Sequence, residues 1–94
     1  MSLVLHELNA TAKGWQLKAT KYFSEKILRK RAYLNVAWIY QVLDHPSHIE
    51  IQEDGRIRHW GYVKELGRYL RVVTLSDGKT VHNAFPDRNF KGAP

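Results

Sequence analysis

The part of the chain between His48 and Phe85 alternates apolar and polar residues with a period of two and is divided by tight-turn signals. Asp54-Gly55 and Asp77-Gly78 are typical of two-residue β-hairpin turns, and Gly67 lies in a third polar stretch. Such turns join strands that pair with their neighbours in sequence, so this half of the chain is predicted to form a four-stranded antiparallel meander. The expected strands cover residues 47–52, 56–63, 69–75 and 80–85.

Two segments before the strands have the spacing of amphipathic helices. The first is expected to run from a cap at Thr20, or at an earlier residue, to about Arg31. The second covers residues 36–44, between an Asn35 cap and the helix-ending Pro46. Their apolar stripes are Phe23, Ile27 and Leu28 in the first helix, and Val36, Ile39, Tyr40 and Leu43 in the second.

The chain has 94 residues, which is the length of one domain. We therefore predict a single α+β domain, 1–94, with two N-terminal helices packed on one face of the meander. Residues 1–14 are the least patterned and are expected to fray or to add an edge strand, and residues 86–94 are expected to form an irregular tail.

The composition excludes several classes of protein. There is no cysteine, so no disulfide, thiolate nucleophile or Cys-ligated zinc can form. No apolar run approaches the roughly 20 residues of a membrane span, and the short N-terminal apolar run is broken by His6 and Glu7, unlike a signal peptide. These features predict a cytoplasmic protein with no membrane contact.

The lengths of the turns set the register of the strands and hence which side chains share a face. They pair Trp60 with Arg71, and Val73 with His82. The face toward the helices is then predicted to hold Ile49, Ile51, Ile57, Leu70, Val72, Thr74, Val81 and Phe85, with the polar residues His59 and Asn83 among them. A buried polar side chain needs a hydrogen-bond partner, so either these two residues have one or one of the predicted registers is wrong by a residue.

The opposite face is predicted to be crowded with guanidinium, imidazole and aromatic groups. Its expected members are His48, Glu50, Gln52, Arg56, Arg58, Trp60, Tyr62, Tyr69, Arg71 and His82. Arginine grips phosphate and aromatic rings stack on bases. The net charge of +6 also favours a polyanionic partner. We therefore expect an RNA-binding surface formed by Arg56, Arg58, Trp60 and Tyr62 together with Lys26, Arg29 and Arg31 of the first helix.

Each of these features also has an alternative explanation. The aromatic residues could close a second small core, or form a docking surface for an antitoxin-like protein. Arg58 and Arg71 could pair with Glu50. The basic run of the first helix could be a solvated face, and Asp87-Arg88 could be an internal ion pair that fixes the tail.

Several segments between Lys26 and Lys91 resemble a family of small prokaryotic domains related to the RelE/ParE and BrnT toxins. The matching segments are 30–31, 40–43, 52–56, 70–73 and 82–88, together with Trp60. The resemblance implies helices packed on a small antiparallel sheet, and several branches of that superfamily are metal-independent ribonucleases. Relatives often begin the first helix with His-Phe, where this chain has Tyr22-Phe23.

Metal-independent RNA cleavage requires proton transfer and stabilisation of charge on the phosphoryl group. His82 suits the proton transfer, and Arg71, its predicted diagonal neighbour, suits the charge. Tyr22 or Tyr62 is expected to be a secondary proton donor. The histidines have no metal-ligand spacing, so neither a metal nor another cofactor is expected.

The expected function is that of an RNA-binding, toxin-like protein with metal-independent endoribonuclease activity. Two other functions stay open at this point. One is a non-catalytic protein-interaction module on the same scaffold, and the other is a toxin directed at DNA or gyrase. His82 could then be an ordinary polar strand residue.

Overall fold

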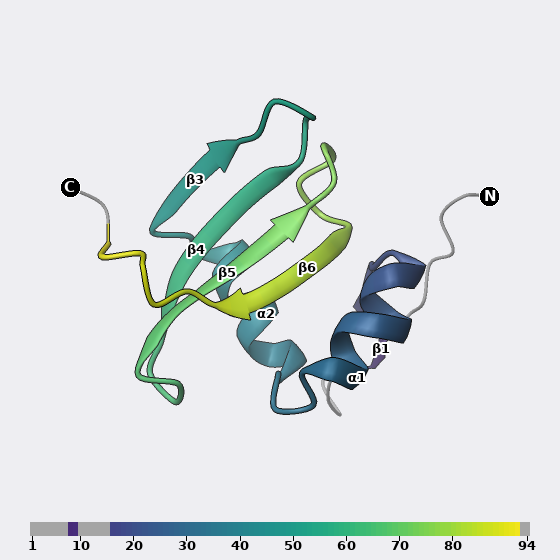
Figure 1. Cartoon of the computed structure of the whole chain (residues 1–94), viewed down its shortest axis with the longest axis horizontal. Helices are drawn as coiled ribbons and strands as arrows, with labels where there is room; N and C mark the ends of the chain where they lie inside the picture. Colours follow the sequence, from purple (N-terminus) through teal and green to yellow (C-terminus); the bar gives the residue numbers. More distant parts are fainter. Residues whose placement is uncertain (1–7, 10–15, 93–94) are drawn as a thin grey trace.

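The computed structural model describes residues 8–9 and 16–92. Two N-terminal helices and a four-stranded antiparallel sheet confirm the α+β class (Figure 1). Most of the unpatterned segment 1–14 lies outside the described residues. The elements, in order, are β1 (Leu8–Asn9), β2 (Gln16–Leu17), η1 (Phe23–Ile27), α1 (Leu28–Lys30), α2 (Val36–Asp44), β3 (His48–Ile51), β4 (Ile57–Val63), β5 (Arg68–Thr74) and β6 (Val81–Pro86).

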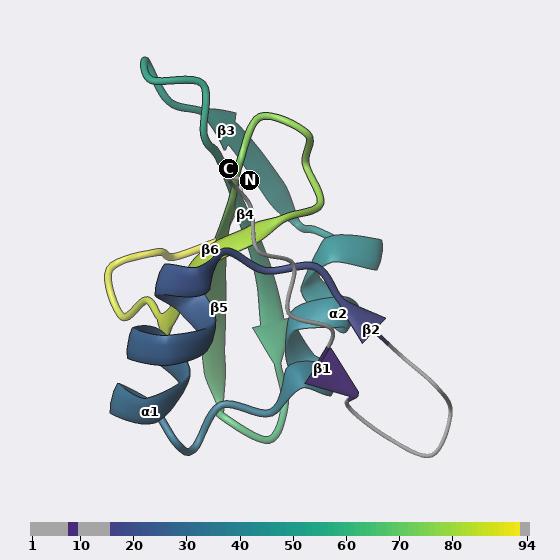
Figure 2. The same ribbon diagram turned by 90° about the vertical axis from the view of Figure 1, so that its right-hand side faces the viewer.

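The first helix begins at the outer edge of β6. Residues 18–20 run beside that strand: Val81 N–H donates to the Lys18 carbonyl and Thr20 N–H donates to the Val81 carbonyl, each at 2.9 Å. Figure 2 shows this segment crossing from β2 to the start of the helix. Thr20 Oγ1 then accepts a hydrogen bond from Phe23 N–H at 3.1 Å, which confirms the predicted cap. The helix has a π-helical turn, η1, followed directly by α1.

The second helix, α2, packs chiefly on β4 and β5, and η1 packs on β6. Asn35 Oδ1 accepts from Ala37 N–H at 2.9 Å, which confirms the second cap. The predicted stripe was only partly correct, since Ile39 is buried but Val42 is the other buried residue of α2. The reason is Gly61 of β4, where a β-carbon would lie 3.1 Å from Val42 Cγ2. A glycine at this point allows the helix to approach the sheet closely.

The predicted register is correct from β3 to β5. Glu50 pairs with Arg58 and Trp60 pairs with Arg71. Gly67 supplies a positive φ of 65° in the turn between β4 and β5. Turn length was therefore sufficient to align these three strands.

The predicted register of β6 is wrong beyond its first residue. Thr74 pairs with Val81, but Val73 pairs with Asn83 instead of His82, so His82 is the extra residue of a β-bulge. The bulge inverts the rest of the strand. Ala84 takes the fully buried core position, while Asn83 and Phe85 lie on the opposite face with Val73 and Arg71.

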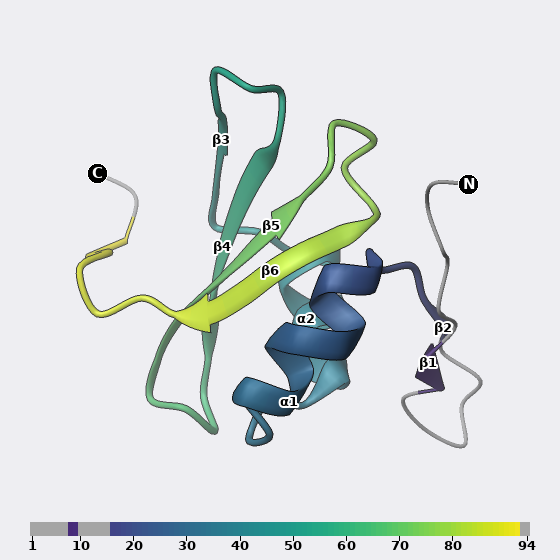
Figure 3. The ribbon, with the colours of Figure 1, turned by 45° about the vertical axis from the view of Figure 1, so that its right-hand side comes forward.

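The core lies between the helices and strands β4 to β6. Its buried apolar residues are Leu17, Ala19, Phe23, Ile27, Leu34, Ile39, Val42, Val63, Leu70, Val72, Val81 and Ala84. The prediction that Ile49 and Ile51 are buried is wrong, because they are 50% and 75% exposed. Strand β3 lies at the edge of the sheet beyond the area that the helices cover (Figures 1 and 3). None of the described helices is long and apolar enough to cross a membrane.

His59 lies on the core face as predicted and has a partner there. The side chain is buried and one ring nitrogen, Nε2, lies 3.1 Å from Thr74 Oγ1. Burial lowers the pKa of His59 below its ordinary value. Protonation of this imidazole therefore costs more in the folded chain than in the unfolded chain.

This burial predicts a loss of stability in mild acid. The unfolded chain binds a proton at the ordinary histidine pKa, so the contribution of His59 is complete above that pKa and declines as the pH falls through it. One such histidine gives a slope of at most about 1.4 kcal/mol per pH unit. Urea unfolding measures the free energy of unfolding between about pH 5 and about pH 8, the range in which histidine titrates. This free energy is expected to change less steeply with pH for His59→Gln than for the wild-type chain. His45→Gln, the same substitution at an exposed position, is the matched control.

Candidate functional site

His82 lies where the β6 bulge meets the start of the first helix. Its Nδ1 is 3.0 Å from Thr20 Oγ1, and its ring centroid is 5.0 Å from that of Tyr22. Tyr22 is 47% exposed, and His82 is half-buried. We call Thr20, Tyr22 and His82 the His82 corner. Two of the three predicted catalytic residues, His82 and Tyr22, are therefore brought together.

Thr20 holds the imidazole by one nitrogen. The threonine hydroxyl already accepts from Phe23 N–H, so it bonds His82 Nδ1 either with its own hydrogen or with its remaining lone pair. Among the described residues, His82 Nε2 makes no hydrogen bond. When Nδ1–H donates to Thr20 Oγ1, Nε2 carries the free lone pair, so in that tautomer Nε2 is the nitrogen that can accept a proton.

The surroundings of His82 favour the neutral imidazole. Burial lowers the pKa of His82, the positive charge of Arg56 lowers it further, and the negative charge of Asp54 partly opposes both effects. Arg56 and Asp54 lie in the β3–β4 turn, with Arg56 Nε 3.7 Å from Asp54 Oδ2. A neutral imidazole with an open nitrogen can accept a proton at neutral pH.

The third predicted catalytic residue, Arg71, is held elsewhere. Its Nη2 and Nε donate to Asp87 Oδ2 at 2.9 and 3.2 Å, and its guanidinium lies 4.7 Å from the centre of the Phe85 ring. The predicted diagonal placement of Arg71 beside His82 is wrong, because the bulge puts Phe85 opposite Arg71. Arg71 therefore neutralises a buried carboxylate next to an aromatic ring.

The tail after β6 covers part of the face that was predicted to be open. The Trp60 ring stacks on Phe90 with centroids 4.8 Å apart and planes 11° apart, and Trp60 Nε1 donates to Asp87 Oδ2 at 3.0 Å. Only 4% of Trp60 is exposed. Tyr69 meets the Phe90 ring edge-on at 4.9 Å. Of the two explanations left open, a second small core fits Trp60.

Asp87 and Phe90 were not predicted as parts of this cluster. Asp87 bonds Arg71 and not its neighbour Arg88, whose side chain is exposed. Burial alone would raise the pKa of Asp87, but hydrogen bonds from Trp60, Arg71 and the Asn89 N–H, with the charge of Arg71, lower it overall. The tail has no periodicity, and the only sequence signal was an acidic residue directly after Pro86.

The other predicted nucleic-acid contacts remain at the surface to different degrees. Tyr62 is half-exposed and meets Tyr69 edge-on at 5.4 Å. Arg58 lies 3.4 Å from Glu50, as the alternative explanation allowed. Surface ion pairs of this kind contribute only about 0–1 kcal/mol, so Arg56 and Arg58 can exchange their carboxylates for phosphate.

The basic run of the first helix divides into two parts. Lys26, Arg29 and Lys30 are exposed. Arg31 is half-buried, and its Nη1 donates to Asn83 Oδ1 at 3.2 Å. Asn83 thus has a hydrogen-bond partner, although it lies on the face opposite to the one predicted.

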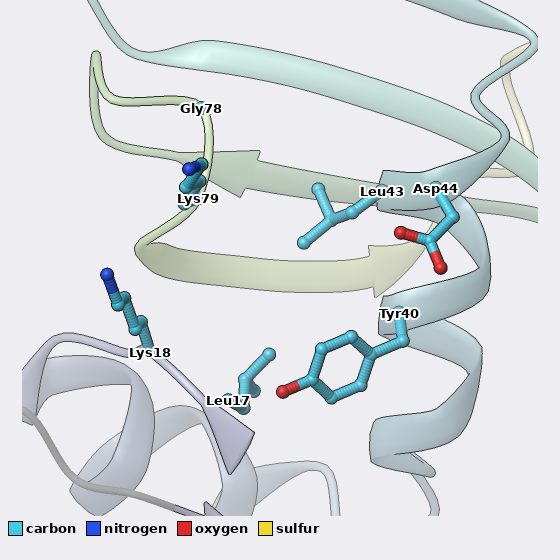
Figure 4. A pocket seen from close by; sticks show the side chains of 7 residues that line it. All are labelled: Leu17, Lys18, Tyr40, Leu43, Asp44, Gly78 and Lys79. Carbon is cyan, nitrogen blue, oxygen red and sulfur yellow. The ribbon is translucent and has the colours of Figure 1, made fainter. Parts of the chain in front are cut away.

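Two hollows of about 460 Å³ each lie away from the His82 corner. One is lined by residues of α2, of β2 and the segment after it, and of the β5–β6 turn, with Lys18 and Lys79 opposite Asp44 (Figure 4). The other lies along β3 and its turn and includes Arg58. Within residues 8–9 and 16–92, no three His, Asp or Glu side chains converge as metal ligands do.

Comparison of the chain with protein-family models, with curated proteins and with solved structures gives no match. The relationship to the RelE/ParE and BrnT toxins therefore stays a prediction from the residues quoted for it. The arguments about function that follow depend on the geometry of the described residues.

Proposed function

We propose that this protein binds RNA along its first helix and cleaves it at the His82 corner, as a metal-independent endoribonuclease of the RelE/ParE and BrnT kind. One observation carries the proposal. A half-buried imidazole, anchored through Nδ1 and open at Nε2, lies beside the exposed phenol of Tyr22, which comes from a different element. The π-helical turn that follows Tyr22 is of a rare type that often occurs at functional sites.

The reaction uses the 2′-hydroxyl of RNA as its nucleophile. His82 Nε2 takes the 2′-hydroxyl proton as a new bond forms from that oxygen to the adjacent phosphorus. The bond from phosphorus to the 5′ oxygen of the next nucleotide breaks, and that oxygen receives a proton from Tyr22. The products are a 2′,3′-cyclic phosphate and a 5′-hydroxyl. Arg56, the cation that acts on His82, would meet the phosphoryl oxygens.

The first helix supplies a path for the RNA backbone. Tyr22, Lys26 and Arg29 follow one another along the first helix, and all three are exposed. An RNA backbone whose phosphates contact Lys26 and Arg29 would reach Tyr22 at the His82 corner.

Neutralising these two cations is expected to weaken RNA binding at every sequence alike. For single-stranded RNA each lost phosphate contact reduces the slope of log K against log salt by about 0.7, so Lys26→Gln with Arg29→Gln should reduce it by about 1.4. Fluorescence anisotropy with an uncleavable 2′-deoxy or 2′-methoxy strand over a salt series measures the slope.

Lys64→Gln with Arg68→Gln is the matched control. It removes the same charge from two exposed positions at the turn between β4 and β5, and it should leave the slope of log K against log salt unchanged. If the control loses as much affinity as the helix variant, binding does not follow the helix. If the wild-type chain does not bind at low salt, RNA is not the ligand, and a protein-interaction module becomes the better proposal.

A further inference from the structure

Strand β3 is an outer strand of the sheet and has an exposed apolar face. The strand order is β3-β4-β5-β6, with β3 at one edge (Figure 1). Ile49 and Ile51 are on the same face as the core but lie beyond the helices, 50% and 75% exposed. Isoleucine is among the residues that are most often buried, so two exposed isoleucines on a four-residue edge strand are unusual.

The backbone groups of the same two residues point away from the sheet. In the β3–β4 hairpin, Gln52 N–H donates to the Arg56 carbonyl at 2.8 Å. In an antiparallel pair, hydrogen-bonded positions alternate along the strand. The residues bonded to β4 are therefore 48, 50 and 52, and the N–H and C=O groups of Ile49 and Ile51 face outward.

Proteins usually block such an edge with proline, lysine, a bulge or a very short strand. Of these devices β3 has its shortness, because His48–Ile51 contains neither proline nor lysine and pairs regularly with β4; its carboxylate, Glu50, is on the face opposite the isoleucines. The outward backbone groups and exposed isoleucines therefore form a two-residue template for another strand.

We propose that two copies of this chain pair through β3, antiparallel about a two-fold axis at Ile49, and join their sheets into one of eight strands. In this register Ile49 lies opposite the partner's Ile49. His48 lies opposite Glu50 of the partner subunit, and the same contact repeats across the axis. Within one chain His48 Nε2 is already 3.7 Å from Glu50 Oε2, so the pairing brings complementary groups together on the face opposite the isoleucines.

The neighbouring register is less favourable. An axis at Glu50 would place two carboxylates directly opposite each other, which destabilises a strand pair. The contact at Ile49 is small compared with the roughly 800 Å² per partner of a standard interface, so the dimer is expected to be weak and dependent on concentration. The His82 corner lies at the other edge of the sheet, on β6, and stays open in the dimer.

Disulfide trapping tests both the pairing and its register, because the native chain has no cysteine. Ile49→Cys places two thiols opposite each other at the axis, at the about 5.5 Å between α-carbons that suits a disulfide. Ile51→Cys is the matched control: its two copies would be about 13 Å apart, beyond the reach of a disulfide. Mild oxidation is expected to give a covalent dimer at least ten times faster for Ile49→Cys.

Sedimentation velocity without oxidation tests the contacts between His48 and Glu50 of the partner subunit. The wild-type chain is expected to dimerise between micromolar and millimolar concentrations, and Ile49→Lys and His48→Glu are each expected to weaken the dimer at least tenfold. The exchange of the two residues, His48→Glu with Glu50→His, should restore it, and Tyr33→Lys, at an exposed site outside the sheet, should not change it. A wild-type monomer at millimolar concentration, or a dimer unaffected by Ile49→Lys, would overturn the proposal and leave the edge to a strand of a different protein.

Discussion

Replacing Asp87 by alanine is expected to lower the free energy of unfolding by about 3–5 kcal/mol, the usual cost of removing one partner from a buried ion pair. Asp87 is 6% exposed. Its Oδ2 accepts three hydrogen bonds, from Trp60 Nε1 and from Nε and Nη2 of Arg71. Its Oδ1 accepts a fourth from Asn89 N–H. Alanine would leave an indole N–H and a guanidinium without their acceptor in a largely dry environment.

Urea unfolding at about neutral pH measures this loss of stability. Glu50→Ala is the matched control, because it removes an exposed carboxylate from Arg58 and should cost less than about 1 kcal/mol. Asp87→Asn keeps one oxygen acceptor and should fall between the two. If Asp87→Ala is no more harmful than Glu50→Ala, the bonds to Asp87 do not hold the tail.

The same carboxylate makes the tail sensitive to acid. The pKa of Asp87 is lowered in the folded chain, so its stabilising effect is complete above the ordinary aspartate pKa and is lost as the pH falls through its folded value. Release of the tail would uncover the Trp60 ring that Phe90 now covers. The tail thus covers Trp60 and part of the aromatic face, and this is why the proposed RNA path follows the first helix instead.

The local patterns of the sequence were sufficient for most of the architecture. Turn length determines strand register, so the pairs Glu50 with Arg58 and Trp60 with Arg71 could be predicted. Side-chain caps act within four residues, so Thr20 and Asn35 could be identified from their types and positions. Each of these features depends on interactions between sequence neighbours or across one turn.

The features that were missed depend on contacts between distant parts of the chain. The bulge at His82 goes with residues 18–20 running along β6, and no turn signal could indicate it. Ile49 has the period of a buried strand, but the area that two short helices cover is decided by their packing on β4 to β6. The burial of Trp60 depends on Phe90, thirty positions later in a segment without periodicity.

These errors of prediction also changed which residues surround His82 in the candidate site. His82 was predicted beside Arg71, but the bulge separates the two and turns the imidazole toward Thr20 and Tyr22. The pairing of His82 with Tyr22 could not be derived from strand register, because Tyr22 belongs to a helix. The cation whose charge lowers the pKa of His82 is Arg56, from the β3–β4 turn.

The largest expected effect on activity is that of removing the His82 imidazole. His82→Ala should lower the rate of RNA cleavage by about 10²–10⁴-fold, the usual share of general acid–base catalysis. The lowered pKa of His82 adds a second signature. A general base must be unprotonated, so the rate should stay high to a more acidic pH than an ordinary histidine would allow, and then fall. Cleavage of a short RNA in the presence of a chelator, with detection of the 2′,3′-cyclic phosphate, measures both effects.

Three variants make this result specific. His82→Asn can keep the hydrogen bond to Thr20 Oγ1 and should be as inactive as the alanine variant while unfolding at the wild-type urea concentration. Tyr22→Phe should lower the rate less than either, since water can replace the phenol as proton donor at its exposed position. His45→Ala removes an exposed histidine and should keep full activity.

Cleavage that survives in a folded His82→Asn chain would show that the imidazole has no part in the chemistry. A wild-type chain that binds RNA without cutting it would make the His82 corner a binding site alone.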